Sequence, residues 1–193
     1  GLMGLKTHAK LSLVIRDEAN GLRRYCHLGT GNYNPKTARA YEDLGILSAD
    51  PELTEDLTKL FNQLSGFAPQ STYSRLLVAP STLRSGIFER IDREIENHKA
   101  GKPAGIQLKL NSILDEGFVE KIYQASQAGV KIDLLVRGIC AVQPGIKGVS
   151  ENITVKSVLG RFLEHSRIFH FVNGGNNEYW IGSADLMGRN LDR

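Results

Sequence analysis

Two stretches of this chain, far apart in the sequence, repeat the same arrangement of residue types. The first begins with His8-Ala9-Lys10 and continues through an apolar run to Gly29-Thr30-Gly31-Asn32. The second begins with His165-Ser166-Arg167 and continues through another apolar run to Gly182-Ser183-Ala184-Asp185. Residues two apart in an extended strand project from the same face. Each copy therefore predicts a histidine and a cation that point into one space, and two copies face to face predict one shared pocket.

These residue types suit the chemistry of phosphoryl transfer. An imidazole nitrogen can attack phosphorus and carry the group, and a second imidazole can protonate or stabilise the leaving oxygen. Neutral imidazole is well populated near pH 7. Lys10 and Arg167 would supply fixed cations, and the planar guanidinium can hold two phosphate oxygens. The glycine-rich turn of the first copy would add open backbone N–H groups and the Asn32 amide. We therefore place His8 and His165 at the centre of a candidate site.

Simpler interpretations of the same residues stay open. A single histidine in a strand most often makes a structural hydrogen bond, which is our interpretation of His27, His98 and His170. Gly31-Asn32 can be an ordinary hairpin turn. The paired histidines also fit a phosphodiesterase, and the basic residues fit a non-catalytic module that only binds polyanions. The repetition of the whole pattern, with a Gly-Ser/Thr turn after each copy, favours phosphoryl transfer.

The charge of the chain is unevenly distributed. Its net charge is only +3, but residues 1–41 carry seven Lys or Arg against Asp17 and Glu18. This excess of positive charge surrounds the first His-x-Lys and suits an anionic substrate, although a solvated basic surface would look the same. A length of 193 residues with 41% hydrophobic residues allows one good core or two small ones.

The sequence predicts a cytoplasmic setting. No apolar run approaches the roughly 18 residues that a membrane span needs, and no signal-peptide pattern opens the chain. Cys26 and Cys140 lie far apart and match no metal or redox spacing, which favours a reduced compartment.

The first part of the chain predicts a hairpin followed by helices. Alternating residues and a turn at Asp17–Gly21 predict two strands, Leu11–Arg16 and Leu22–Leu28. Helical patterns cover Pro35–Tyr41 and Pro51–Leu64. A Pro- and Ser-containing stretch at Gly66–Ser74 predicts a boundary between two domains, residues 1–70 and 71–193.

The second part predicts a helix-covered, largely parallel sheet, because strands and helices alternate at short intervals. The expected helices are Ser81–Ala100 and Asp115–Ala128, the latter ended by Gly129. The expected strands are Leu76–Ala79, Ile106–Leu110, Lys131–Val136, Ile153–Leu159, Arg161–Val172 and Tyr179–Gly182, the last two joined by a turn at Asn173–Asn177. No helix follows the last strand to cover the sheet, so we expect the chain to be truncated at both ends.

The duplicated pattern resembles the phospholipase D superfamily and, within it, the phosphohistidine type of bacterial polyphosphate kinase. The resemblance extends over essentially the whole chain. The strings that carry it are Gly4-Leu5-Lys6-Thr7-His8-Ala9-Lys10, Arg24-Tyr25-Cys26-His27-Leu28-Gly29-Thr30-Gly31-Asn32-Tyr33-Asn34, Thr37-Ala38-Arg39-Ala40-Tyr41, Leu135-Val136-Arg137-Gly138-Ile139-Cys140 and Gly182-Ser183-Ala184-Asp185-Leu186-Met187.

This resemblance implies an α/β, phospholipase D-like fold with mixed sheets flanked by helices and two pseudo-repeated halves. It implies reversible transfer of the ATP γ-phosphate to the end of a polyphosphate chain, with Mg²⁺ as cofactor. His8 matches the phosphorylated histidine and His165 the second histidine of the site. Tyr41 and Arg137 match residues that contact the nucleotide or its phosphates.

One departure from the wider superfamily separates the kinase from the phosphodiesterases. Phosphodiesterase members carry Asp five residues after the cation, in the pattern His-x-Lys-x(4)-Asp, whereas this chain has Ile15 and Val172 there. This weakens a lipase or nuclease interpretation.

The resemblance also sets our expectations about partners and cofactors. The expected substrates are ATP or ADP and inorganic polyphosphate, and nucleic acid is not expected to bind. The full-length enzyme is expected to be a homo-oligomer that associates peripherally with a membrane. The family's metal-associated arginines would precede Gly1, so the sequence names no metal ligand. We expect the isolated fragment to be inactive.

Overall fold

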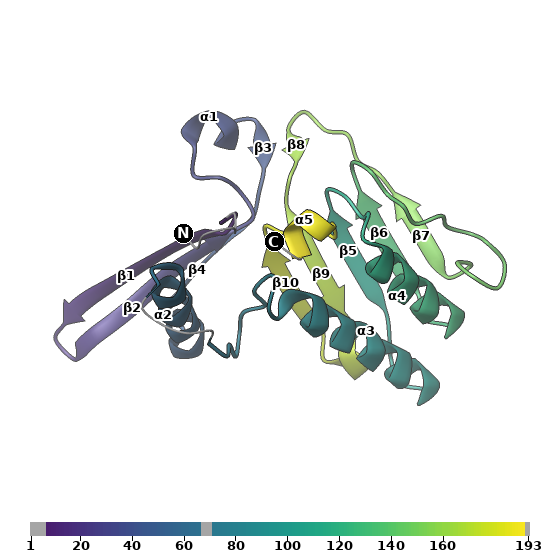
Figure 1. Cartoon of the computed structure of the whole chain (residues 1–193), viewed down its shortest axis with the longest axis horizontal. Helices are drawn as coiled ribbons and strands as arrows, with labels where there is room; N and C mark the ends of the chain where they lie inside the picture. Colours follow the sequence, from purple (N-terminus) through teal and green to yellow (C-terminus); the bar gives the residue numbers. More distant parts are fainter. Residues whose placement is uncertain (1–6, 67–70, 192–193) are drawn as a thin grey trace.

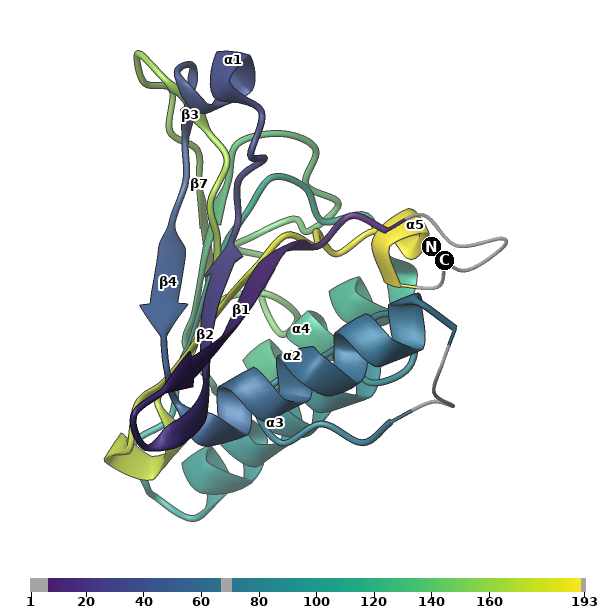
Figure 2. The same ribbon diagram turned by 90° about the vertical axis from the view of Figure 1, so that its left-hand side faces the viewer.

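The chain folds into two parts whose sheets lie side by side. The computed structural model describes residues 7–66 and 71–191. A long hairpin with one helix forms the first part, and a larger sheet with two long helices forms the second (Figure 1). The helices of both parts lie on the same side of the sheets (Figure 2). Within the described ranges, no helix is long and apolar enough to cross a membrane.

The first part is an antiparallel sheet in the order β1-β2-β4. Its strands are β1 (Lys10–Glu18), β2 (Gly21–Gly29) and β4 (Gly45–Ser48). Helix α2 (Pro51–Leu64) packs against it through the buried Leu57 and Leu60. The helix begins where Asp50 accepts a hydrogen bond from the Leu53 amide at 2.8 Å, with proline in its first turn.

The second part is a five-stranded mixed sheet in the order β10-β9-β5-β6-β7. The strands are β5 (Ile106–Leu110), β6 (Ile132–Val136), β7 (Ile153–Lys156), β9 (Arg167–Phe171) and β10 (Glu178–Gly182). Helices α3 (Leu83–Lys99) and α4 (Glu116–Gln127) cover one face, and a 3₁₀ turn η1 (Asn173–Gly175) and a short helix α5 (Gly188–Leu191) complete the part. The main core cluster belongs to this part, and Phe118 and Phe171 are its largest fully buried side chains.

A two-stranded parallel ribbon joins the two parts. Strand β3 (Tyr41–Glu42) follows the short helix α1 (Pro35–Ala38) and pairs with β8 (Leu163–Glu164). The two segments rise side by side above the sheets (Figure 1). Because β8 leads directly into β9, the ribbon fixes residues of the first part next to the start of β9.

Three expectations about local structure are wrong. The expected helix Pro35–Tyr41 ends at Ala38, because Tyr41 belongs to strand β3, which pairs with β8. Leu76–Ala79 is not a strand, because the backbone amides of residues 74–76 donate to the buried Asp56 carboxylate instead of to a neighbouring strand. The expected single strand Arg161–Val172 divides into β8 and β9, because the amides of residues 165 and 166 both donate hydrogen bonds to the Glu42 carbonyl.

The second sheet is less parallel than expected. Only β5, β6 and β7 pair in parallel, whereas β9 runs antiparallel to both β5 and β10. A short hairpin connection forces the β9–β10 pair to be antiparallel. The division at residues 1–70 and 71–193 stays a prediction, and residues 67–70 of its boundary Gly66–Ser74 lie outside the described residues.

The start of α4 gives a test of what holds the second part together. Asp115 caps the Phe118 amide at 3.1 Å and contacts the Arg84 guanidinium at 2.7 and 2.8 Å. Replacing Asp115 with Ala removes both interactions and should lower the free energy of unfolding by about 2 kcal/mol. The matched cap variant Asp50→Ala should cost about 1 kcal/mol. Urea denaturation measures both, and equal losses would contradict the contribution of Arg84.

The same carboxylate should make stability depend on acid. The hydrogen bond from Arg84 lowers the pKa of Asp115 below its usual value, despite partial burial. Its contribution is therefore present above the pKa of the unfolded chain and is lost as pH falls through the folded pKa. The difference between wild type and Asp115→Ala should shrink over that acidic range.

Candidate active site

The sequence repeat is also a structural repeat. Lys10 begins β1 and lies opposite Gly29 of β2, and Arg167 begins β9 and lies opposite Gly182 of β10. In both copies the cation therefore faces the glycine of the Gly-Ser/Thr turn across an antiparallel pair. The two histidines come just before their strands and not within them, which corrects the expectation that each strand presents its histidine.

Each cation turns back to its own histidine. The Lys10 Nζ donates to the His8 carbonyl at 2.6 Å and lies 3.0 and 3.1 Å from the two His8 ring nitrogens. In the second copy, Nη1 of Arg167 donates to the His165 carbonyl, also at 2.6 Å. The cation two residues after each histidine thus fixes the backbone that carries the imidazole. Both cations are buried, whereas His8 is exposed.

A carboxylate from the second turn holds Arg167 in place. Asp185 accepts hydrogen bonds from the guanidinium at 3.3 and 3.0 Å. It also accepts from the backbone amides of Asn111 at 2.8 Å and Ser112 at 3.3 Å. The Arg167 side chain is only 4% exposed. A buried guanidinium with a paired carboxylate keeps both its charge and a fixed orientation.

The second histidine is oriented by the first copy. His165 Nδ1 lies 2.7 Å from Asp43 Oδ1, and the Thr30 hydroxyl donates to that same oxygen at 2.7 Å. A Cβ at Gly31 would collide with the Asp43 carboxylate, so glycine is required there. The Tyr41 ring packs on the His165 ring with centroids 4.9 Å apart. The first turn therefore positions Asp43, and Asp43 positions the histidine of the other half.

One backbone amide of the first turn, that of Thr30, is engaged within the protein, and the expected anion cradle stays a prediction. The Thr30 amide donates to the Leu44 carbonyl at 2.9 Å, and the Thr30 hydroxyl accepts from the Leu44 amide at 3.0 Å. These bonds hold the turn against the segment that carries Asp43. Asn32 lies exposed on the surface after it, and no described contact connects Asn32 to the histidines.

The environment of His165 favours the neutral imidazole. Burial lowers the pKa of His165, and the charges of Arg167 and Lys10 lower it further, whereas the hydrogen bond and charge of Asp43 oppose this. With a neutral ring, Nδ1–H donates to the Asp43 carboxylate and Nε2 keeps its lone pair.

Residues of both copies line one cavity of about 1030 Å³, although His165 is not among them. His8 and Lys10 line it from the first part, and Arg167 and Asp185 line it from the second. Among the described residues of its wall, Asp185 is the one carboxylate. The cations are Lys10, Arg75, Arg90, Arg167 and Arg189. Arg75, Arg90 and Arg167 are each ion-paired with a carboxylate, and most of the other lining residues are apolar.

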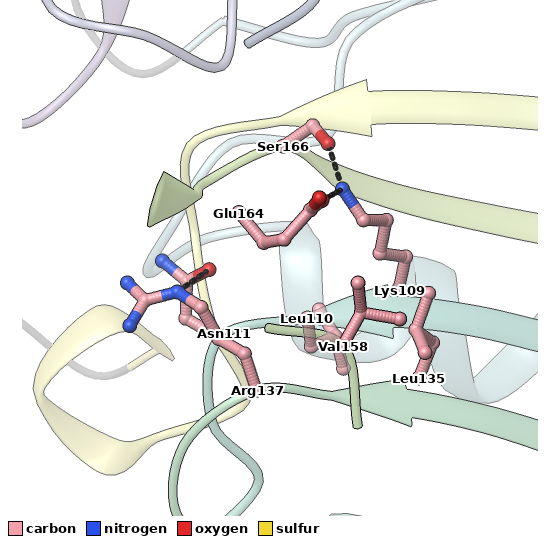
Figure 3. Close-up of a pocket in the computed structure, with 8 residues that line it drawn as sticks. All are labelled: Lys109, Leu110, Asn111, Leu135, Arg137, Val158, Glu164 and Ser166. Atoms are coloured by element: carbon pink, nitrogen blue, oxygen red, sulfur yellow. Dashed lines mark hydrogen bonds and ion pairs between the residues drawn. The ribbon is translucent and has the colours of Figure 1, made fainter. Parts of the chain in front are cut away.

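A small polar hollow lies at the carboxyl ends of β5 and β6 (Figure 3). Arg137 follows β6, as expected, and its Nε donates to the Asn111 side chain at 3.1 Å. The Lys109 ammonium lies between Glu164 and Ser166, with its contact to Glu164 at 2.6 Å. The carboxyl ends of parallel strands are where α/β sheets usually bind ligands.

Comparison with known proteins assigns this chain to a family. Residues 76–193 match the family described as polyphosphate kinase C-terminal domain 2, and residues 1–70 match polyphosphate kinase C-terminal domain 1. Over 193 residues the chain is 63% identical to a polyphosphate kinase of Streptomyces coelicolor and 58% identical to one of Mycobacterium avium.

The chain belongs to the polyphosphate kinase family. It spans 26% of the length of these two curated relatives. A crystal structure of polyphosphate kinase from Porphyromonas gingivalis matches the whole chain with a TM-score of 0.93 and 42% identity, and the chain covers 30% of it. The expected α/β fold with mixed sheets flanked by helices is confirmed, as is the resemblance read from the sequence.

The polyphosphate kinase family suggests a metal, but the described residues do not form a centre for one. Among residues 7–66 and 71–191, no three His, Cys, Asp or Glu side chains gather where they could hold an ion. The free Cys26 and Cys140 supply no such site either. We therefore derive no step through a protein-bound metal.

Sequence reasoning missed Asp43, and it did not foresee that Thr30 of the first turn would hold it. Asp43 lies 122 residues from His165, and no spacing rule links it to either histidine. The one available signal was the Gly-Thr-Gly turn, whose second glycine makes room for the Asp43 carboxylate. That glycine was interpreted as part of an anion cradle or as hairpin punctuation.

The Asp43–His165 contact can be tested without measuring activity. Asp43→Asn removes the negative charge that raises the pKa of His165, whereas burial and the nearby cations continue to lower it. The pKa of His165 should therefore be lower in the variant than in wild type. Histidine titration followed by NMR measures this shift. Asp17→Asn at the hairpin tip is the matched control and should leave it unchanged. An unchanged or raised pKa in Asp43→Asn would contradict the proposed orientation.

Proposed function

We propose that this chain forms part of an ATP:polyphosphate phosphotransferase that works through a phosphohistidine. One observation carries the proposal: His8 and Lys10 of the first copy and Arg167 of the second line one cavity, and Asp43 of the first half holds His165 of the second. In the proposed site, two imidazoles and two fixed cations would surround one transferred group. Membership of the polyphosphate kinase family supports the same reaction.

His8 is the proposed nucleophile. Its ring nitrogen forms a bond to the γ-phosphorus of ATP while the bond from that phosphorus to the β,γ-bridging oxygen breaks, and ADP leaves. A terminal oxygen of polyphosphate then attacks the phosphorus, the P–N bond breaks, and the chain grows by one phosphate. Each step is reversible. The exposure of His8 suits a group that must meet two substrates in turn.

His165 handles protons in this scheme. Because its Nδ1–H is directed to Asp43, Nε2 can accept the proton of an incoming terminal phosphate. The Asp43 carboxylate then stabilises the imidazolium that forms. In the reverse direction the same nitrogen returns the proton to the leaving chain.

The cations balance the charge that the transferred phosphoryl group carries. Lys10 and Arg167 face the cavity, and Arg167 is fixed there by Asp185. Arg137 and Tyr41 are proposed to contact the nucleotide or its phosphates. Asn32 is proposed to reach the substrate from the first turn, although it lies on the surface.

The remaining features of the full-length enzyme are also proposals. Mg²⁺ would enter with the nucleotide phosphates, because the described residues provide no centre of their own. The substrates would be ATP or ADP and polyphosphate, not nucleic acid. We propose a cytoplasmic homo-oligomer with peripheral membrane association, and we expect the 193-residue chain alone to be inactive.

The absence of the phosphodiesterase aspartates favours this proposal over a lipase or nuclease. Ile15 of β1 and Val172 after β9 occupy those positions, and neither side chain can accept a proton. A passive polyanion binder would need neither the histidine pair nor the Asp43 contact.

The phosphohistidine is the feature to test. The full-length protein carrying this sequence, incubated with ATP labelled in its γ-phosphate, should gain acid-labile, base-stable label. His8→Ala should abolish it, because the attacking nitrogen is lost. His98→Ala, on helix α3, is the matched control and should keep it. Acid-stable label, or label that survives His8→Ala, would contradict the proposal.

A further inference from the structure

His165 lies in a break between two strands. Strand β8 ends at Glu164 and β9 begins at Arg167, so His165 and Ser166 belong to neither strand. Their amides both donate to the Glu42 carbonyl at 3.1 Å. Two residues thus face one residue of the partner strand, as in a β-bulge, where the regular ladder is disrupted. The segment that carries this histidine therefore depends on contacts other than a continuous strand pairing.

A lysine from the middle of the five-stranded sheet contacts both neighbours of this histidine. Lys109 lies in β5, which is flanked by β9 and β6. Its ammonium group contacts the Glu164 carboxylate at 2.6 Å and donates to the Ser166 hydroxyl (Figure 3). These two contacts, which we call the Lys109 anchor, tie the end of β8 and the residue before β9 to one central strand.

The Lys109 anchor is largely shielded from water. The side chains of Lys109 and Glu164 are 19% and 14% exposed, and Ser166 is buried. An exposed ion pair contributes little to a fixed geometry, because water and salt screen it and both side chains stay mobile. A shielded ammonium group with two partners is held more firmly, and removing one partner leaves the others without compensation.

The lysine acts on the segment and not on the ring that the segment carries. The imidazole of His165 contacts the Asp43 carboxylate and the Tyr41 ring, both from the first half. The contacts of Lys109 are instead with the side chains on either side of His165. The first half therefore orients the ring, and the second half holds the backbone beneath it.

The first copy of the His-x-cation pattern has no equivalent hydroxyl group. Its middle residue is Ala9, whereas that of the second copy is Ser166. The two histidines also differ in burial, since His8 is exposed and His165 is buried. The copy with the serine is the one whose histidine needs a fixed direction for proton transfer.

We propose that Lys109 is a positioning residue for His165, which acts by anchoring Glu164 and Ser166 to the centre of the five-stranded sheet. The anchor fixes the backbone of His165 relative to Arg167, whose guanidinium the second turn holds separately. Without the anchor, the segment between β8 and β9 moves more freely, and the imidazole is less firmly buried.

The consequence for catalysis rests on the proposed function. In that scheme Nε2 of His165 accepts the proton of the incoming phosphate, which requires a closely directed lone pair. Formation of the phosphohistidine from ATP depends instead on the ring nitrogen of His8. Loss of the Lys109 anchor should therefore slow the discharge of the phosphohistidine more than its formation.

Titration of His165 followed by NMR in the 193-residue chain tests the anchor without the reaction. Burial lowers the pKa of His165, and the hydrogen bond to Asp43 only partly offsets this. A looser, more hydrated ring should regain a pKa nearer its ordinary value. In Lys109→Met the proton affinity of His165 should rise about two- to tenfold, as expected for the loss of one hydrogen bond. Ser166→Ala should raise it too, although no charge changes.

Two matched variants serve as controls. Lys121→Met removes a lysine that is 16% exposed and contacts Asp92 at 2.5 Å between helices α4 and α3. Ser126→Ala removes another buried hydroxyl group, which accepts from the Asn152 amide at 3.3 Å. Both controls should keep the wild-type proton affinity of His165.

The serine variant decides the outcome, because a rise confined to Lys109→Met could come from the lost charge alone. A rise in Ser166→Ala that Ser126→Ala does not show supports the Lys109 anchor. An unchanged or lowered proton affinity in Ser166→Ala would overturn the proposal, as would the same rise in both controls. If Lys109→Met fails to fold, the serine pair still gives the answer.

The full-length protein carrying this sequence tests the catalytic consequence. Lys109→Met should slow transfer from phosphorylated His8 to polyphosphate about tenfold or more, but change phosphohistidine formation from ATP by less than about twofold. Lys121→Met should leave both steps unchanged. Equal rates of loss in the two steps, or no loss in either, would contradict a role through His165. If wild type forms no phosphohistidine, the proposed function fails, and the titration of His165 still decides the role of Lys109.

Discussion

The hydrogen bond between Asp43 and His165 is the interaction on which the site depends. It joins the two halves of the chain, orients the imidazole and leaves Nε2 directed away from the carboxylate. Its parts come from three places: the Thr30 turn that fixes the carboxylate, the β3–β8 ribbon that brings the segments together, and the burial that keeps the ring neutral.

Unlike His165, which a residue of the other half orients, each cation is fixed by contacts within its own half. Lys10 and Arg167 both donate to the carbonyl of the histidine two residues earlier. Arg167 is further held by Asp185, which two backbone amides anchor. Positive charge is thus built in locally, whereas the orientation of His165 requires both halves. The contacts that fix the positive charge therefore lie within each half, whereas the contact that orients His165 lies between the halves.

Local patterns in the sequence predicted the elements but not the contacts between them. Helix α2 was predicted with its observed bounds from its apolar stripe alone, and the structure adds the Asp50 cap that begins it. The repeated His-x-cation and its turn were visible because they are short and recur. Asp43 was not, because its partner is 122 residues away and a lone Asp after β3 carries no local signal. The split of β8 from β9 was missed for the same reason, since Glu42 in the other half causes it.

A crystal structure of the full-length protein carrying this sequence, with orthovanadate in the cavity, tests the shared site most directly. We predict one vanadium atom bonded to a ring nitrogen of His8, with His165 Nε2 within hydrogen-bond reach of a vanadate oxygen and Asp43 still on Nδ1, because in-line transfer needs both groups around one centre. Imidazoles of His8 and His165 more than about 15 Å apart, with vanadate on neither, would contradict a site built from both halves.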